Sequence, residues 1–226
     1  MLKKRLALLC ELIEGGGPLC DVGTDHGLLP IFLVKEGRVP LAYACDIAEG
    51  PLSCAKRNIL AQNVEDRVIP VLSDGLDKIP PGSVKEVVIA GMGGEMIAGI
   101  VNRAEWLKDG VGLILQPNSR AGFLVGWLCM SGYRVVRQLA VLDGGIYYTA
   151  LRAEHDGNMW SPTLEETILG GLEKTDPAAR EYVKREAERL RSAAKGMSRS
   201  RDQISRQKVK DIIKAVTVLE QFIGED

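Results

Sequence analysis

The chain has 226 residues, of which 46% are hydrophobic and 26% are charged, and its formal net charge is −1. These values are ordinary for a soluble globular protein, and the length allows one α/β domain with an appendage. No apolar run approaches the roughly 18 residues that a membrane span needs, so we expect no membrane partner.

Two patterns alternate along the first two thirds of the chain. Apolar residues at helical spacing predict a helix over residues 2–14, which ends at the glycines of residues 15–17. Short apolar runs predict strands over Leu19–Val22, Leu41–Asp46, Val68–Leu72, Val84–Ala90, Val111–Gln116, Tyr133–Val141 and Tyr147–Arg152. Helices are predicted between them, over Leu28–Glu36, Pro51–Gln62, Glu95–Arg103 and Phe123–Met130.

This alternation indicates a parallel sheet with helices on both faces. The last two strands are separated only by Leu142-Asp-Gly-Gly145, and a loop this short joins only antiparallel strands. The sequence therefore predicts a Rossmann-like α/β fold of the class I methyltransferase type. Its seven-stranded sheet is expected to be mostly parallel, with one antiparallel strand.

The strand pattern stops near residue 154, and residues 155–162 read as a linker. Beyond it, Val183, Ala187, Leu190, Ala194 and Met197 step by 4, 3, 4 and 3, and Val209, Ile212, Val216, Leu219 and Ile223 step by 3, 4, 3 and 4. Such seams predict an α-helical coiled-coil hairpin. We therefore expect two domains, residues 1–154 and residues 155–226.

The net charge of the whole chain hides a basic segment. Residues 1–154 hold 16 Lys and Arg against 17 Asp and Glu, whereas residues 180–214 hold 12 against 5, a net charge of +7. Such a charge run is either a solvated helix face or a surface for nucleic acid, and its density favours RNA contact.

The five cysteines are scattered and form no C-x-x-C pair, and residues 1–5 carry no signal-peptide pattern. We therefore expect free thiols in a reducing compartment, a cytoplasmic protein and no metal site.

The candidate cofactor site begins at Asp21-Val-Gly-Thr-Asp-His-Gly27, between the second predicted element and its following helix. Glycines in a turn at the end of a strand allow a ligand to lie against the backbone, and open α/β sheets bind ligands at that edge. The carboxylate of Asp21 suits an ammonium group and repels a pyrophosphate, which favours S-adenosylmethionine over NAD. Within this turn, Gly23, Thr24 and Gly27 are further cofactor candidates.

Three more turns at predicted strand ends extend this site. Asp46 and Ile47 end the next strand, where an acidic residue binds ribose hydroxyls. Asp74 and Gly75 follow the third strand, and a carboxylate there can accept the adenine amino group. The fourth strand ends in a glycine-rich turn that leaves space for a ligand. Its candidates are Ala90, Gly91, Met92 and Gly93.

The turn Gln116-Pro-Asn118 follows the fifth strand. Its amides offer donors and acceptors without charge, which fits recognition of a neutral base edge, although a helix-capping turn reads the same way.

Three segments together resemble the bacterial tRNA (adenine-22, N1)-methyltransferase family. They are Asp21-Val-Gly-Thr-Asp-His-Gly-Leu-Leu-Pro30, Ile89-Ala-Gly-Met-Gly-Gly94 and Leu113-Ile-Leu-Gln-Pro-Asn118. The likeness extends over nearly the whole chain, including the basic C-terminal helices. It implies methyl transfer from S-adenosylmethionine to N1 of an adenine in tRNA, with position 22 resting on the resemblance alone.

In this interpretation N1 needs no strong base, because it carries a free lone pair at neutral pH. Positioning beside the methyl group then provides most of the acceleration. Asp25 is the candidate for stabilising the cationic product, with His26 and Asn118 as helpers, although His26 reads equally well as a structural hydrogen-bonding residue. The candidate phosphate contacts in the C-terminal helices are Arg185, Arg189, Arg199, Arg201 and Lys208.

Alternatives stay open at this stage. The chain could methylate a small molecule or a protein, with the helical hairpin serving only for dimerisation, and either a monomer or a homodimer is compatible with the sequence. It could also be a non-catalytic module that binds S-adenosylmethionine. An NAD-dependent oxidoreductase is disfavoured, because the first turn lacks the full G-x-G-x-x-G motif.

Overall fold

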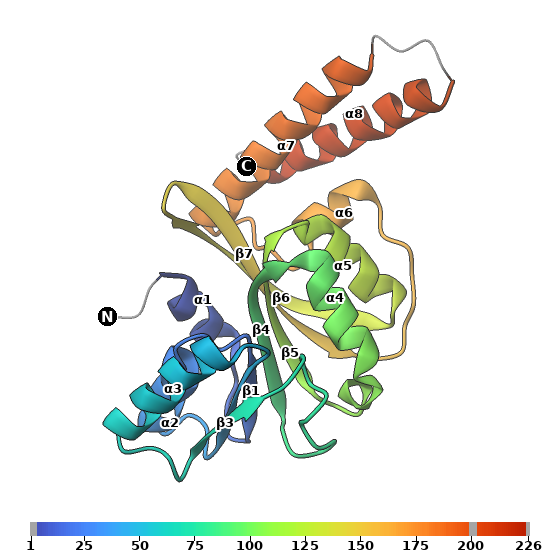
Figure 1. Cartoon of the computed structure of the whole chain (residues 1–226). Coiled ribbons are helices and arrows are strands. Elements are labelled where there is room, and N and C mark those ends of the chain that lie inside the picture. Colours follow the sequence, from blue (N-terminus) through green and yellow to red (C-terminus); the bar gives the residue numbers. More distant parts are fainter. Residues whose placement is uncertain (1–3, 199–202, 225–226) are drawn as a thin grey trace.

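A seven-stranded mixed sheet runs through the centre of the computed structural model, which describes residues 4–198 and 203–224 (Figure 1). The strand order is β3-β2-β1-β4-β5-β7-β6. The strands are β1 (Leu19–Val22), β2 (Ala42–Asp46), β3 (Val68–Leu72), β4 (Glu86–Gly93), β5 (Gly112–Ser119), β6 (Tyr133–Asp143) and β7 (Ile146–His155). The first five are parallel, and β7 is antiparallel to both β5 and β6. The predicted class I methyltransferase fold is confirmed.

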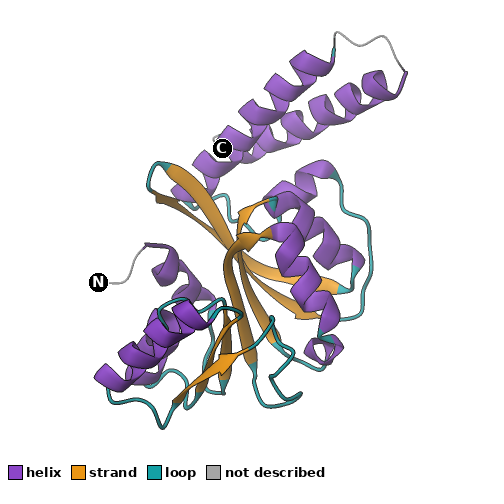
Figure 2. Ribbon diagram, in the orientation of Figure 1, coloured by secondary structure: helices purple, strands orange, loops and turns teal. Residues whose placement is uncertain are grey.

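Helices cover both faces of this sheet (Figure 2). One face carries α1 (Lys4–Leu12), α2 (Leu28–Lys35) and α3 (Glu49–Ala61), and the other carries α4 (Gly94–Arg103), a 3-10 turn (Glu105–Lys108) and α5 (Ala121–Met130). Each face has its own apolar core, and the sheet residues alternate between the two. Val88 and Ile114 pack with the first group of helices, whereas Ile89 and Leu115 pack with the second.

The C-terminal region is helical, with α6 (Leu164–Leu169), α7 (Pro177–Met197) and α8 (Gln203–Ile223). The long helices α7 and α8 lie side by side and project from the edge of the sheet (Figure 1). Val183, Ala187 and Leu190 pack against Val216 and Leu219, so the predicted pairing of two C-terminal helices is confirmed. The division into two domains at residue 154 stays a prediction.

Helix α6 was not among the predicted elements. Thr163 caps this helix with a capping box, in which the Glu166 N–H donates to Thr163 Oγ1 at 3.4 Å and the Thr163 N–H donates to Glu166 Oε2 at 2.7 Å. A Thr-x-x-Glu spacing is a readable signal for the start of a helix. The helix has only six residues, too few for an apolar periodicity to stand out.

Four strands run further than predicted: β4 to Gly93, β5 to Ser119, β6 to Asp143 and β7 to His155. Strands β4 and β5 keep pairing beyond Ala90 and Gln116. Their register shifts there, and Met92 pairs with Pro117 and Gly93 with Ser119. This irregular pairing brings the glycine-rich turn after β4 alongside the turn after β5.

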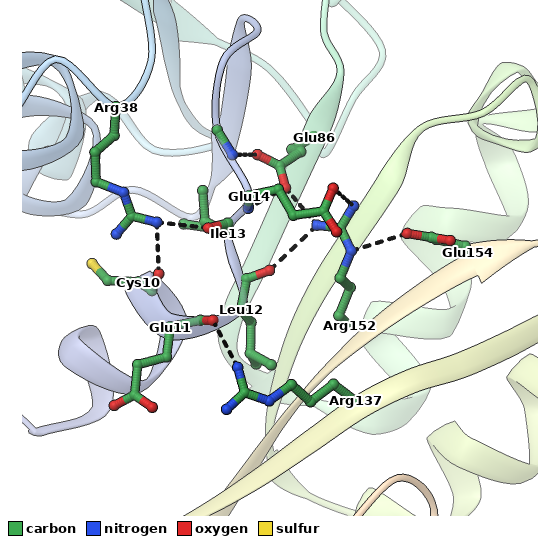
Figure 3. A network of polar contacts seen from close by, with 11 residues as sticks. Cys10, Glu11, Leu12, Ile13, Glu14, Arg38, Glu86, Arg137, Arg152 and Glu154 are labelled. Atoms are coloured by element: carbon green, nitrogen blue, oxygen red, sulfur yellow. Dashed lines mark hydrogen bonds and ion pairs between the residues drawn. The ribbon is translucent and has the colours of Figure 1, made fainter.

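Three arginines hold the end of α1 in place: Arg137 and Arg152 from the sheet, and Arg38 from the loop between α2 and β2 (Figure 3). Backbone carbonyl groups in the last turn of α1 and just after it accept hydrogen bonds from these side chains. Arg38 donates to the carbonyl groups of Cys10 and Ile13, Arg137 to that of Glu11, and Arg152 to that of Leu12. Helix C-termini leave such carbonyls without partners inside the helix, and cations there also complement the helix dipole.

Arg152 is the centre of this network. Its side chain is 9% exposed, and its Nη1 lies 2.5 Å from Oε1 of Glu86, which is itself 5% exposed. Its other nitrogens pair with Glu154 at 3.0 Å and Glu14 at 3.1 Å. Glu86 also accepts the backbone N–H groups of Glu14 and Gly15, both at 2.9 Å. One buried ion pair therefore joins α1, β4 and β7.

We expect Arg152→Met to lower the free energy of unfolding by about 3–5 kcal/mol, because it leaves the Glu86 carboxylate buried without a cation. Urea unfolding followed by circular dichroism measures this. Arg137→Met, which removes one exposed hydrogen bond, is the matched control and should cost about 1 kcal/mol or less. Adding Glu86→Gln to Arg152→Met should recover part of the loss. Equal losses for the Arg137 and Arg152 variants would contradict this account.

Candidate functional site

A cavity of about 230 Å³ lies at the C-terminal ends of the parallel strands. The strand ends contribute Asp21, Gly23, Thr24, Asp25, His26, Ala90, Gly91 and Gln116, and helices α1 and α2 contribute Arg5, Leu6, Leu9, Leu28 and Leu29. The structure thus brings together the predicted turns after β1 and β4.

The turn after β1 is held by its backbone. The N–H groups of Gly23 and Thr24 both donate to the carbonyl O of Cys45 in β2, each at 2.9 Å. Gly23 has a φ of +75°, and a Cβ on it would lie 2.5 Å from Cε of Met92, so this position favours glycine. Asp25 has a φ of +52°, which is unusual for a residue with a side chain. This left-handed conformation turns the chain at the rim of the cavity.

Asp21 is a buried carboxylate in the wall of the cavity. Burial raises its pKa to about 6, the charge of Asp46 adds to the rise, and the hydrogen bond from Thr24 Oγ1 at 2.7 Å opposes it. A cation placed in the cavity would stabilise the ionised form. The site therefore fits the cationic amino group of S-adenosylmethionine.

Asp46 and Asp74 do not line this cavity. Asp46 Oδ1 accepts the Ala48 N–H at 2.9 Å and Oδ2 accepts the Asp25 N–H at 3.4 Å, so this carboxylate also supports the two turns. Asp74 is exposed and pairs with Arg103 at 2.9 Å. The adjoining Ile47 is 68% exposed, and Gly75 is buried with a φ of +58°.

The small volume of the cavity explains why Asp46 and Asp74 do not line it. The cavity is smaller than the roughly 300 Å³ at the lower end of ordinary ligand pockets. We therefore expect it to hold the methionine end of the cofactor, with the adenosine end lying over the open strand ends near Asp46 and Asp74.

Asn118 does not line this cavity but bonds to Gly91 and Arg5, which do, and its catalytic role stays a prediction. Its Nδ2 donates to the carbonyl O of Gly91 at 2.7 Å, and its Oδ1 accepts from Gln116 at 3.2 Å and from Arg5 at 3.3 Å. Gln116 Oε1 in turn accepts the Gly91 N–H at 3.2 Å. These amides fix the Gly91 turn. Met92 and Gly93 continue β4 beyond the cavity.

Asp25 and His26 lie together at the cavity rim. Asp25 Oδ2 is 3.4 Å from His26 Nε2, and both side chains are more than half exposed. The carbonyl O of His26 accepts from Asn58 at 2.9 Å, and Gly27 begins α2 with a φ of +69°. An acid at this position is available to a substrate that approaches from solvent.

Helix α1 supplies a wall that the sequence analysis did not assign to the site. Arg5, Leu6 and Leu9 line the cavity, and Arg5 pairs with Asp143 at 3.0 Å. The helical spacing of the leucines identified a buried face but could not say which surface it covers. That contact depends on the fastening of α1 to the sheet.

The described members of the predicted RNA contacts lie on the paired helices α7 and α8, with Arg185 and Arg189 one turn apart. Arg185 lies over the ring of Tyr147 at 4.7 Å, Arg189 pairs with Glu186 at 2.7 Å, and Lys208 is exposed on α8. Arg199 and Arg201 lie outside the described residues.

The model of the family described as "Methyltransferase domain" matches residues 2–151. The tRNA (adenine(22)-N(1))-methyltransferase of Bacillus subtilis is 34% identical over 154 residues, which are 68% of this chain and 65% of that protein, slightly less than two thirds of its length. A solved Streptococcus pneumoniae structure, of a candidate tRNA (m1A22) methyltransferase with S-adenosyl-L-methionine, is 30% identical. It superposes with a TM-score of 0.80 over 96% of this chain and all of that one.

The chain belongs to the tRNA (adenine-22, N1)-methyltransferase family. The solved B. subtilis m1A22 tRNA methyltransferase has a TM-score of 0.85 and 27% identity, and the match covers 99% of both chains. The predicted family, its enzyme class and its cofactor S-adenosylmethionine are confirmed. The roles of individual site residues stay predictions.

Cofactor affinity should depend on pH through Asp21. Because the pKa of Asp21 is raised to about 6 in the cofactor-free protein, its carboxyl is mostly neutral below that pH and cannot pair with the cofactor amino group. Affinity for S-adenosylhomocysteine, which keeps that amino group, should therefore fall as pH drops through about 6, by up to roughly tenfold per pH unit. Calorimetric titrations between pH 5 and 8 measure this.

The control is Asp21→Asn, which should bind weakly and without this pH dependence. A wild-type affinity that is constant between pH 5 and 7 would show that Asp21 does not hold the amino group.

Proposed function

We propose that this protein transfers a methyl group from S-adenosylmethionine to N1 of adenine 22 in tRNA. The observation that carries the proposal is the match with the B. subtilis m1A22 tRNA methyltransferase over 99% of both chains, which includes the C-terminal helices. The cavity supports the proposal, because it is lined both by the buried carboxylate of Asp21 and by the exposed carboxylate of Asp25.

Three acidic residues along the edge of the sheet would each bind a different part of the cofactor. Asp21 would hold the amino end of the cofactor, Asp46 the ribose and Asp74 the adenine, the last while sharing its carboxylate with Arg103. When bound, the cofactor supplies an electrophilic methyl group. The Gly91 turn, fixed by Gln116 and Asn118, forms the wall opposite the β1 turn.

The chemistry asks little of the protein beyond positioning. N1 of neutral adenine has a free lone pair, so no base must remove a proton before attack. The methylated ring becomes cationic, and the exposed carboxylate of Asp25 would stabilise it electrostatically. His26, 3.4 Å away, would orient that carboxylate. Because N1 lies on the pairing edge, the target base must leave its stack, and the exposed rim leaves it room to enter.

Methylation of unmodified tRNA with radiolabelled methyl donor, followed by mass spectrometric mapping, tests this function. We expect 1-methyladenosine at position 22 and no product from tRNA that carries G22. Asp25→Asn should lower kcat about tenfold and leave affinity for S-adenosylhomocysteine unchanged, since an exposed charge contributes less than one in a dry site. Label at another nucleotide, or none, would refute the proposal.

The basic helices α7 and α8 would hold the tRNA by its phosphates, with residues 155–226 as the RNA-contacting unit. A tRNA substrate in turn implies a cytoplasmic enzyme. Within the described residues, no helix is long and apolar enough to cross a membrane. Monomeric and homodimeric forms are both compatible with this assignment.

Salt dependence tests the role of these helices. The triple variant Lys184→Ala, Arg185→Ala and Lys208→Ala should weaken tRNA binding and reduce the slope of log K against log salt by about 2–3, close to one per lost phosphate contact. The control is the exposed set Lys35→Ala, Lys78→Ala and Lys108→Ala in the other domain. Equal slopes for the two triple variants would remove α7 and α8 from the RNA interface.

A further inference from the structure

A second, larger cavity of about 560 Å³ lies where the end of β5, the start of β7 and helices α6 and α7 meet. We call it the junction cavity. It adjoins the cofactor cavity across a thin wall, because Asn118 lines the junction cavity and donates to Gly91, which lines the cofactor cavity. The two cavities are therefore neighbours at the ends of β4 and β5.

Aromatic side chains gather in the junction cavity. The chain has only three Phe, three Trp and five Tyr, yet Phe123, Tyr147, Tyr148 and Tyr182 all line this cavity. Tyr182 is nearly buried and Tyr147 and Tyr148 are partly buried, whereas Phe123 is 41% exposed. Phe123 stands in the first turn of α5, so its ring is the one most available to an incoming planar group.

Arginines accompany these rings. Among the described residues, the three contacts of an arginine over an aromatic ring all border this cavity: Arg5 on Tyr148 at 4.7 Å, Arg120 on Phe123 at 5.6 Å and Arg185 on Tyr147 at 4.7 Å. Arg189 also lines it. Aromatic rings with cations between them are the arrangement that stacks bases and contacts the linking phosphates of single-stranded RNA.

The acids nearby do not block such contacts. Arg120 pairs with Glu95 at 2.7 Å, but both side chains are about 60% exposed, and pairs of that kind contribute little. Glu186 binds Arg189 through Nε and Nη2, which leaves further guanidinium N–H groups free to reach a phosphate. A polyanion can therefore take up these cations at small cost.

We propose that the junction cavity is a second nucleotide site, which holds the nucleotide next to the target adenine in the tRNA. Its base stacks on Phe123, and its phosphate contacts Arg120 and Arg189. Removing the target from its stack exposes one face of the neighbouring base, and the Phe123 ring replaces the lost stacking partner. The volume lies in the range of small-molecule pockets and accommodates one nucleotide. This inference rests on the proposed function.

Photo-crosslinking tests the occupant directly. Phe123 is replaced by p-benzoylphenylalanine in the full chain, which is irradiated with unmodified tRNA and S-adenosylhomocysteine. The control carries the same group in place of Met130, which is 53% exposed at the other end of α5. We expect a crosslink to the nucleotide immediately beside the target adenine. A crosslink to the target itself, or a yield no higher than in the control, would overturn the proposal.

Kinetics gives a second readout. Phe123→Ala should raise the KM for tRNA about tenfold, in the range of a lost base–aromatic stack, while affinity for S-adenosylhomocysteine stays unchanged. Phe123→Trp should restore KM, and Met130→Ala should not change it. If wild-type enzyme methylates adenine 22 but Phe123→Ala behaves like Met130→Ala, this inference alone fails. If wild-type enzyme methylates no tRNA, the proposed function fails as well.

Discussion

The buried ion pair between Arg152 and Glu86 is the constraint on which the rest of the site depends. Both side chains are removed from water, and such a pair is tolerated only when its remaining donors and acceptors are used. They are used here by the end of α1, whose backbone groups bond to both partners. The ion pair therefore also positions α1, whose N-terminal half forms a wall of the cofactor cavity.

Through Arg5, helix α1 also contacts the end of β5 and the β6–β7 hairpin, which are distant from it in sequence. Arg5 contacts Asn118 near the end of β5 and Asp143 at the tip of the β6–β7 hairpin, and its guanidinium lies over Tyr148. The cofactor cavity and the junction cavity thus share a supporting residue on α1. The strand ends supply the chemistry of the site, while α1 fixes the distance between its two halves.

Much of this arrangement could be read from the sequence, and the limits have physical causes. The strands and the turns after β1 and β4 followed from apolar runs and glycines, because local sequence controls both. The Gln116-Pro-Asn118 segment was read either as a base-recognition turn or as a helix-capping turn. In the structure the Asn118 side chain bonds to Gly91, Gln116 and Arg5, and the contact with Gly91 depends on the shifted pairing of β4 and β5. The site role of Arg5 and Leu9 depends on tertiary packing, which no local pattern of α1 encodes.

The junction cavity shows the same limit. Phe123, Tyr147 and Tyr182 come from three elements far apart in sequence, and each alone reads as an ordinary core or surface aromatic. Only the packing of α6 and α7 on the edge of the sheet brings them together. The basic charge of the C-terminal segment was visible in the sequence, but the contact of its Arg185 with the ring of Tyr147 was not.

The raised pKa of Asp21 has a consequence for the life of the protein in the absence of its ligand. A carboxylate that is ionised at neutral pH but buried without a cation lowers the free energy of unfolding. The cofactor-free protein is therefore less stable than it would be without the buried charge of Asp21. Ligand binding returns that stability by mass action. The enzyme should therefore resist proteolysis best when methyl donor is abundant, which links its abundance to the supply of the molecule that it consumes.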